Sequence, residues 1–421
     1  MTAIARSDRA ASKDYRPAIL GCGLSGMMLL QLVGKGSGLF IQVSSFMMLF
    51  LTLMIALSYP KTNRLNAMLV LLVSAFSLII VMEAFRAAEF LGAAVFFRAV
   101  GVLMFLALGL LLATRKDHGL LERALPVYAV TFVGVLVIVL LDNDRQWDRL
   151  RGHMHPNLWA FVAATAMVGI MTARIPLYVR YFLIAFVAYM LAMEFQTRGA
   201  LIWSSLTIGC FGLLYALKGM RLSKRPLLHL SLYVVIFIAL TAGFLASLDY
   251  LLVEVLAVNS ATRGLDTGFT GRGMIWAEYL TRFAERPLLG HGFDMSRYVA
   301  ENFLTDAGGR DISSTHNSYL TMLFDTGLVG FAIYITLLAL MILGALRSGA
   351  LMPFIMVFLL SGITESRPLN VGNPSGLLFV LLIPYCAASA FGLRQRFAGH
   401  SLRRSTGRQT LSAPAINVNS V

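Results

Sequence analysis

The chain has 421 residues, of which 58% are hydrophobic and only 13% are charged, whereas about 25% are charged in an ordinary soluble domain. Together with the mean hydropathy of +0.75, this composition excludes a water-soluble globule and predicts one polytopic membrane domain. The formal net charge of +14 fits a surface for nucleic acid or anionic lipid, or basic cytoplasmic loops, and the positions of the charges decide between these.

Twelve apolar segments have about the length of a membrane-spanning helix, which needs about 20 residues. We therefore expect an all-α membrane protein. The expected spans are approximately 18–34, 39–59, 67–85, 91–114, 124–142, 158–173, 178–196, 200–219, 230–248, 327–346, 350–365 and 376–392. Residues 1–17 are polar and basic without a cleavage signal after them, so the first span is expected to be retained.

The basic residues are concentrated in alternate connecting segments. With a cytoplasmic N-terminus, the cytoplasmic segments hold 21 of the 35 basic residues and four of the 21 acidic residues. Cytoplasmic loops carry this bias. It predicts a cytoplasmic segment at 1–17, one membrane domain over 18–392, and a basic, disordered cytoplasmic tail at 393–421. The net charge therefore reports topology, and no nucleic-acid partner is expected.

The turn between the seventh and eighth spans contains Glu194 and Arg198, four residues apart. One interpretation is a surface ion pair. The functional alternative is an arginine that binds a phosphate at the membrane boundary, because the guanidinium group matches phosphate geometry better than an ammonium group does.

Two features of the earlier spans are candidates for polar chemistry. Asp142 and Asp144 form an acidic pair that suits a divalent cation beside a diphosphate, but nearby arginines would neutralise it, and no ligand set elsewhere has metal spacing. Arg98 lies inside the fourth span, where an ionisable residue is a functional candidate. Its structural alternative is an ion pair with Glu83 or Glu89.

The longest stretch without a span is 249–326, and it is predicted to face outward. Loops of this length are usually functional. A short amphipathic helix is expected over 272–286, with Pro287 after it and Thr270 as a plausible N-cap. Its apolar face is predicted to comprise Ile275, Trp276, Tyr279, Leu280 and Phe283, with Glu278, Arg282 and Glu285 opposite.

That helix would place Arg272 in its first turn. A cation there opposes the helix dipole, but it fits a site in which the arginine and the free N–H groups bind an anion together. The alternatives are an ion pair with Asp266 or a solvated side chain.

A second short helix is predicted over 314–326, capped by Ser314 or Thr315 and broken at Gly327. His316 would lie in its first turn, where the dipole keeps imidazole neutral and able to accept a proton. A neutral histidine is what a general base requires. The alternative is a histidine that only caps its helix.

Arg198, Arg272 and His316 occur in an order and setting that resemble the bacterial O-antigen ligase and O-antigen polymerase superfamily of polyprenyl-diphosphate glycan transferases. His316-Asn317, nine residues and Gly327-Leu-Val-Gly330 resemble the ligase signature H-[NSQ]-x9-G-x-x-[GTY]. Arg198-Gly-Ala resembles its S/T-R-G-A element. Arg272-Gly-Met-Ile-Trp276, followed by Pro287-Leu-Leu-Gly-His-Gly292, resembles its R-x3-W…P-x-x-G-x-G run.

The resemblance implies a membrane glycosyltransferase of the bacterial inner membrane, whose active loop is periplasmic. It would move a glycan from a polyprenyl diphosphate to a hydroxyl of lipid A core or of a glycan chain, with inversion and without metal or cofactor. His316 would be the base, and Arg198 and Arg272 would hold the diphosphate. Possible supporting residues are Asn317, Arg151, His155, Arg98 and Trp276.

Other functions fit parts of the pattern. A polymerase of O-antigen or exopolysaccharide and a protein O-glycosylating relative share the donor and differ in the acceptor. Arg198 and Gly209 fit the R-x10-G spacing described for polymerases, but the second R-x10-G of some polymerases is absent, because Phe283 follows Arg272 at that spacing. A polytopic transporter is the rival from another class, but the two halves of the chain lack a matching pair of broken spans.

Overall fold

The computed structural model describes residues 14–33, 38–115, 119–142, 145–146, 149–150, 156–195, 197–219, 272–304, 315–348, 351–365 and 376–391. Side chains at the edges of some of these ranges, including those of Arg198 and Arg272, are not described. The predicted span at 230–248 lies outside the described residues, as do most of the loop 249–326 and the expected tail 393–421.

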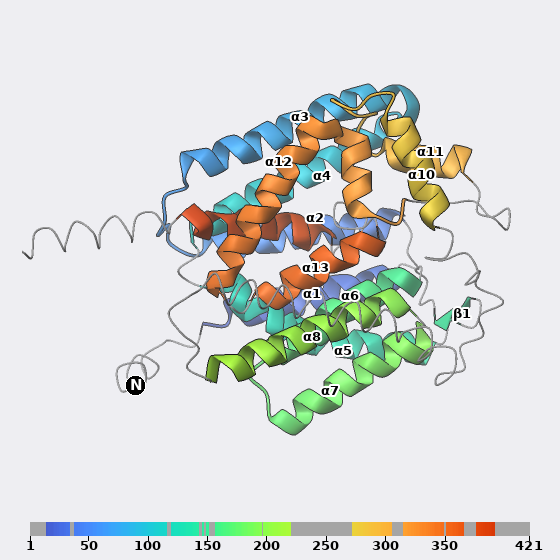
Figure 1. Cartoon of the computed structure of the whole chain (residues 1–421). Coiled ribbons are helices and arrows are strands. Elements are labelled where there is room, and N and C mark those ends of the chain that lie inside the picture. Colours follow the sequence, from blue (N-terminus) through green and yellow to red (C-terminus); the bar gives the residue numbers. More distant parts are fainter. Residues whose placement is uncertain are drawn as a thin grey trace, which may run out of the picture.

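The described chain is almost entirely helical (Figure 1). The helices in chain order are α1 (Arg16–Val33), α2 (Gly38–Leu57), α3 (Ala67–Leu91), α4 (Ala94–Ala113), α5 (Leu120–Asp142), α6 (Pro156–Thr172), α7 (Leu177–Tyr189), the π-helix η3 (Met190–Glu194), α8 (Arg198–Gly219), α10 (Arg272–Phe283), α11 (Met295–Phe303), α12 (Ser318–Ser348) and α13 (Met352–Thr364), followed by a helix over Gly376–Phe391. Two short antiparallel strands, β1 (Arg145–Gln146) and β2 (Arg149–Leu150), form a hairpin after α5. The all-α prediction is confirmed, apart from this hairpin.

The apolar helices have the lengths of a polytopic membrane protein. Among the described residues, five are long and apolar enough to cross a membrane, and five shorter apolar helices accompany them. Every predicted span except 230–248 coincides with a helix. The outer helix predicted over 314–326 and the span predicted over 327–346 form one element, α12, which is kinked at Gly327.

The helices sort into a buried centre and an apolar rim. Trp159 and Phe161 of α6, Phe358 of α13 and Phe379 of the last helix are almost fully buried, as expected for helices that are apolar on all sides. By contrast, α2, α3 and α7 expose large apolar side chains, such as Tyr178 and Phe182 of α7, which are 77% and 71% exposed. Such a rim fits a lipid environment, in which apolar side chains face outward.

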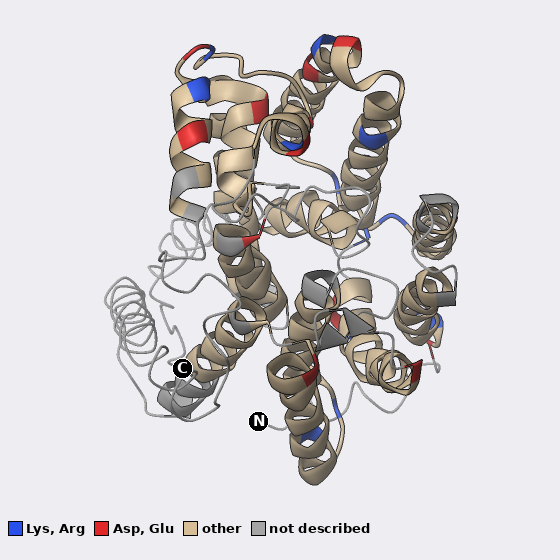
Figure 2. Ribbon diagram, turned by 90° about the vertical axis from the view of Figure 1, so that its right-hand side faces the viewer, with Lys and Arg blue, Asp and Glu red and all other residues tan. Residues whose placement is uncertain are grey.

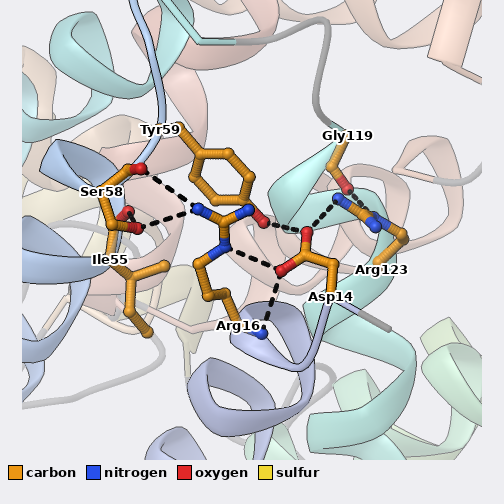
Figure 3. Close-up of polar contacts among 7 residues, drawn as sticks. All are labelled: Asp14, Arg16, Ile55, Ser58, Tyr59, Gly119 and Arg123. Atoms are coloured by element: carbon orange, nitrogen blue, oxygen red, sulfur yellow. Dashed lines mark hydrogen bonds and ion pairs between the residues drawn. The ribbon is translucent and has the colours of Figure 1, made fainter. Parts of the chain in front are cut away.

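The two ends of the bundle differ in their polar structure. At the Asp14 end, the start of α1, the α2–α3 connection and the start of α5 meet around Asp14 (Figure 3). At the site end, α10 and α11 lie beside the outer half of α12 and the end of α3 (Figure 1). Acidic and basic segments alternate in the upper part of Figure 2, where α10 and α11 lie, whereas most of the remaining helical ribbon carries no charge.

Candidate functional site

Helix α10 begins at Arg272, as predicted, so this residue lies in the first turn. Ile275 and Tyr279 are buried, and Glu278 pairs with Arg282 on the opposite face with an N–O distance of 2.7 Å. Leu280, which was predicted on the buried face, is 51% exposed. That part of the prediction is wrong because the buried stripe of α10 is narrower than the apolar pattern.

The connection after α10 packs into the break of α12. Gly327 has a φ of 64°, and a side chain at this position would clash with the Leu288 carbonyl. The break frees backbone groups that pair with the connection. The hydrogen bonds run from His291 N to Phe324 O, from Gly292 N to Asp325 O, from Leu328 N to Pro287 O and from Val329 N to Leu288 O, at 2.9, 3.0, 2.8 and 3.2 Å. The predicted break at Gly327 is therefore confirmed, and it joins the connection to α12.

His291 belongs to the packing between α12 and the connection after α10, and not to the predicted catalytic residues. Its ring stacks on Phe324 with centroids 4.3 Å apart, and Nε2 lies 2.8 Å from the Arg282 carbonyl. Burial lowers the pKa of His291 below its usual range, because a charged imidazolium is disfavoured where water is excluded.

His316 lies just before α12 and not within its first turn. Its φ of 51° is unusual for a residue with a side chain. The helix begins at Ser318 and is capped by Asn317, whose Oδ1 accepts hydrogen bonds from the N–H groups of Tyr319 and Leu320 at 3.0 and 2.9 Å. The predicted cap Thr315 and the predicted helical position of His316 are wrong, because Asn317 is the residue whose side chain reaches the free N–H groups. The other predicted cap, Ser314, lies outside the described residues.

The sequence did not single out Glu365, which faces His316. The His316 Nδ1 atom is 3.9 Å from Glu365 Oε2 and has no hydrogen-bond partner. Glu365 follows α13, and its backbone carbonyl accepts a hydrogen bond from the Ser318 hydroxyl. The only sequence signal for Glu365 was an acidic residue at the end of an apolar segment. Its closeness to His316 depends on how α12 packs on α13.

Helix α8 begins at Arg198, after a turn that differs from the predicted one. The chain passes through the π-helix η3, and the Thr197 N–H donates to the Leu191 carbonyl at 3.1 Å. Glu194 is buried and accepts a hydrogen bond of 2.8 Å from the Tyr189 hydroxyl. The interpretation of Glu194 as part of a surface ion pair is therefore wrong as to the surface, because η3 turns this carboxylate inward. π-Helical turns occur often at functional sites.

The starts of α8, α10 and α12 all lie at the site end. Ile202, Trp203 and Leu206 of α8 pack on Leu360 of α13, so the first turns of α8 lie beside the end of α13. The start of α12 meets the same part of α13, since the Tyr319 hydroxyl donates to the Leu359 carbonyl at 2.7 Å. The start of α10 reaches the His316 turn through Trp276, whose indole donates to the Thr315 carbonyl.

Of the possible supporting residues, Arg98 has a partner that the sequence did not indicate. It forms an ion pair with Asp294, at the start of α11, while Glu83 pairs with Arg86 at 2.8 Å. The predicted pairing with Glu83 or Glu89 is therefore wrong, because α11 lies against α3 and α4 and brings Asp294 to Arg98. Arg151 and His155 lie outside the described residues, as do Asp144, Thr270 and Asp266. Within the described ranges, no three His, Cys, Asp or Glu residues are grouped as for a metal ion.

Comparison with known proteins gives a match to the part of the chain that contains the motif residues. Residues 181–335, which include all three motif residues, match a family model described as "O-Antigen ligase". An O-antigen ligase of Pseudomonas aeruginosa (strain PAO1) is 30% identical over 229 residues, which cover 51% of this chain and 54% of that protein. The chain thus spans about half the length of the curated relative that it matches.

Proposed function

We propose that the chain belongs to the O-antigen ligase superfamily and transfers a glycan from a polyprenyl diphosphate to an acceptor hydroxyl, a proposal supported by the match of residues 181–335 and by the similarity to an O-antigen ligase. The observation that carries this proposal is the position of His316. Its Nδ1 atom has no hydrogen-bond partner, it faces a carboxylate, and it lies at the site end, where α8 and α10 begin. Free N–H groups at the starts of these two helices would favour an anion such as a diphosphate.

In the proposed reaction, the acceptor oxygen attacks the anomeric carbon and its proton passes to His316 Nε2. The bond between that carbon and the diphosphate oxygen breaks, and its electron pair stays on the diphosphate. Arg198 and Arg272, at the starts of α8 and α10, stabilise the charge that develops there. A single displacement of this kind inverts the anomeric configuration, and none of its steps requires a metal ion or a cofactor.

Glu365 supports the base in this proposal. Its carboxylate faces Nδ1, so it favours the tautomer with a proton on Nδ1 and leaves Nε2 free to accept one. It also stabilises the imidazolium that forms, as the carboxylate of a catalytic triad does. The 3.9 Å separation would shorten when substrate binds, because such contacts often tighten in the substrate complex.

The enzyme assay should use the purified chain, a polyprenyl-diphosphate glycan and a lipid A core acceptor. We expect transfer to continue in EDTA, with an inverted product, and to be lost in His316→Ala. Full dependence on Mg²⁺ together with loss of transfer in Asp142→Ala would refute the metal-free mechanism. Movement of intact glycan into vesicles without bond formation would identify a transporter instead.

The acceptor is proposed to be lipid A core, because the matched relative is named an O-antigen ligase. A polymerase of the same superfamily would extend a glycan chain on the carrier. Deletion of the gene distinguishes the two functions. Loss of a ligase leaves lipid A core uncapped while long carrier-linked glycan accumulates, whereas loss of a polymerase leaves single repeat units on the core.

We also propose that the Asp14 end is cytoplasmic and the site end periplasmic, in one membrane domain over 18–392 of the bacterial inner membrane. The exposed residues Lys61 and Glu285 lie at these two ends. They provide a matched pair of positions for cysteine labelling. In a cysteine-free background, an impermeant maleimide should label Glu285→Cys in intact spheroplasts. Lys61→Cys should be labelled only after permeabilisation, and the reverse result would invert the topology.

A further inference from the structure

We propose that Trp276 is a positioning residue, which holds the His316 turn at a fixed place relative to the helix that begins at Arg272. This inference rests on the proposed function, because it assigns a role within the same site. It goes beyond that function in naming the contact that sets the spacing between the base and the diphosphate-binding helix.

The contact is a hydrogen bond between two elements. The indole N–H of Trp276 donates to the backbone carbonyl of Thr315 with an N–O distance of 3.0 Å. Trp276 follows Arg272 by four residues on α10, and positions four apart share one face of a helix. The face of α10 that begins with Arg272 is therefore the face that meets the residue preceding His316.

The His316 turn has its own internal hydrogen bonds. The Thr315 hydroxyl accepts from the Asn317 N–H at 3.2 Å and lies 2.6 Å from the Thr321 hydroxyl, and the Asn317 side chain caps α12. These contacts stay within residues 315–321, so they shape the turn and its left-handed His316. They do not determine where the turn lies relative to α10.

Contacts on either side of His316 join the turn to two other helices, α13 and α10. The Ser318 hydroxyl donates to the Glu365 carbonyl and fixes the turn to the end of α13. Trp276 fixes it to α10. Because the rate of a displacement depends steeply on the alignment of base, acceptor and leaving group, loss of the Trp276 bond should slow the chemical step more than it weakens donor binding.

The test compares kinetic constants of purified, full-length variants. Trp276→Phe keeps an aromatic ring and removes the N–H donor, and we expect kcat to fall by about 10- to 100-fold while KM for the donor stays within about twofold. Trp276→His keeps a ring N–H and should recover part of the rate. If Trp276→Phe folds poorly, the kinetic constants of Trp276→His provide a second test of the hydrogen bond.

Tyr279→Phe is the matched control. The Tyr279 hydroxyl also joins α10 to a backbone carbonyl, that of Ser296 in α11, but this bond does not reach the His316 turn. Tyr279→Phe should therefore keep kcat within about twofold of the wild type. An equal fall in kcat in both variants would overturn the proposal, because it would indicate general loosening of α10.

A double variant separates positioning from structure. If Trp276 acts through His316, then Trp276→Phe should not reduce the residual rate of His316→Ala any further, because residues that act as a unit are not additive. Losses that multiply in the double variant would refute the positioning role. A fully active His316→Ala would instead refute the proposed base, and it would do so whatever Trp276→Phe shows.

Discussion

Asp14 and Glu365 are carboxylates at opposite ends of the helix bundle, and each faces a basic side chain. The Asp14 carboxylate accepts hydrogen bonds from Arg16 Nε at 2.7 Å and from the Tyr59 hydroxyl at 2.5 Å, and Arg123 approaches it at 3.2 Å (Figure 3). Glu365 lies 3.9 Å from His316 Nδ1, which has no hydrogen-bond partner.

This difference separates a group that stabilises the fold from a group that is prepared for chemistry. A hydrogen-bonded polar cluster rigidifies its surroundings. A ring nitrogen without a partner, on a backbone in a sparsely populated conformation, is costly for stability and is typical of functional sites. The Asp14 end therefore joins helices, while the site end keeps a histidine whose Nδ1 atom is not held by a hydrogen bond.

The largest expected effect comes from a substitution at the break of α12, where the connection after α10 packs. Gly327→Ala places a side chain at a φ of 64° and against the Leu288 carbonyl, so we expect about 3 kcal/mol or more of destabilisation and loss of transfer. Gly134 of α5 has open space around it, and Gly134→Ala should be neutral or slightly stabilising. Thermal unfolding in detergent measures both, and equal midpoints would contradict this account of the break.

The next largest effect is expected when the Glu365 carboxylate is replaced by an amide of the same size. Glu365→Gln removes the charge that faces His316, so kcat should fall by about 10- to 100-fold. Asp14→Asn makes the same chemical change at the other end and should leave kcat unaltered. A wild-type kcat in Glu365→Gln would separate this carboxylate from the base.

Acidification should loosen the site end before the Asp14 end. Because burial lowers the pKa of His291 in the folded chain, the unfolded chain binds a proton first as pH falls below the usual value of 6.5, and the site end loses stability there. Hydrogen exchange, corrected for its intrinsic dependence on pH, should show lower protection at pH 5 than at pH 7 in α10 and the connection that follows it. His291→Phe should reduce this difference, and equal protection at both pH values would count against it.

The smallest expected effect concerns Asp14 itself. Burial alone would raise the pKa of Asp14, but hydrogen bonds from Arg16 and Tyr59 lower it to about 2. Its stabilising contribution is thus complete above the ordinary value of 3.8 and is lost as pH falls through about 2. Asp14→Asn should lower stability by about 1 kcal/mol at neutral pH, as measured by thermal unfolding, and a variant as stable as the wild type would refute the role of this cluster.

Much of the fold was predictable because long apolar runs have few alternatives to a helix in a membrane. The start of α10 at Arg272 and the break at Gly327 were also predicted correctly, since the apolar periodicity, Pro287 and the glycine act locally. Local patterns failed where several adjacent residues could serve one role. Ser314, Thr315 and Asn317 are all of residue types that cap helices well, and in the structure the cap is Asn317.

The contacts that define the site could not be read from local patterns. Glu365 meets His316 across 49 positions of chain because α12 packs on α13. Arg98 finds Asp294, rather than a nearer glutamate, because α11 lies against α3. Pairings over such distances depend on tertiary packing, which spacing along one helix does not encode.

The most direct test of the central claim is the rate of glycan transfer by His316→Ala in EDTA, measured beside Asp14→Asn and with added imidazole. If His316 is the base, its variant should lose about 100-fold or more in rate, should recover part of that rate with imidazole, and should unfold at the wild-type temperature. Asp14→Asn should transfer at the wild-type rate. A wild-type rate in His316→Ala would contradict the assignment of the site end as the catalytic end.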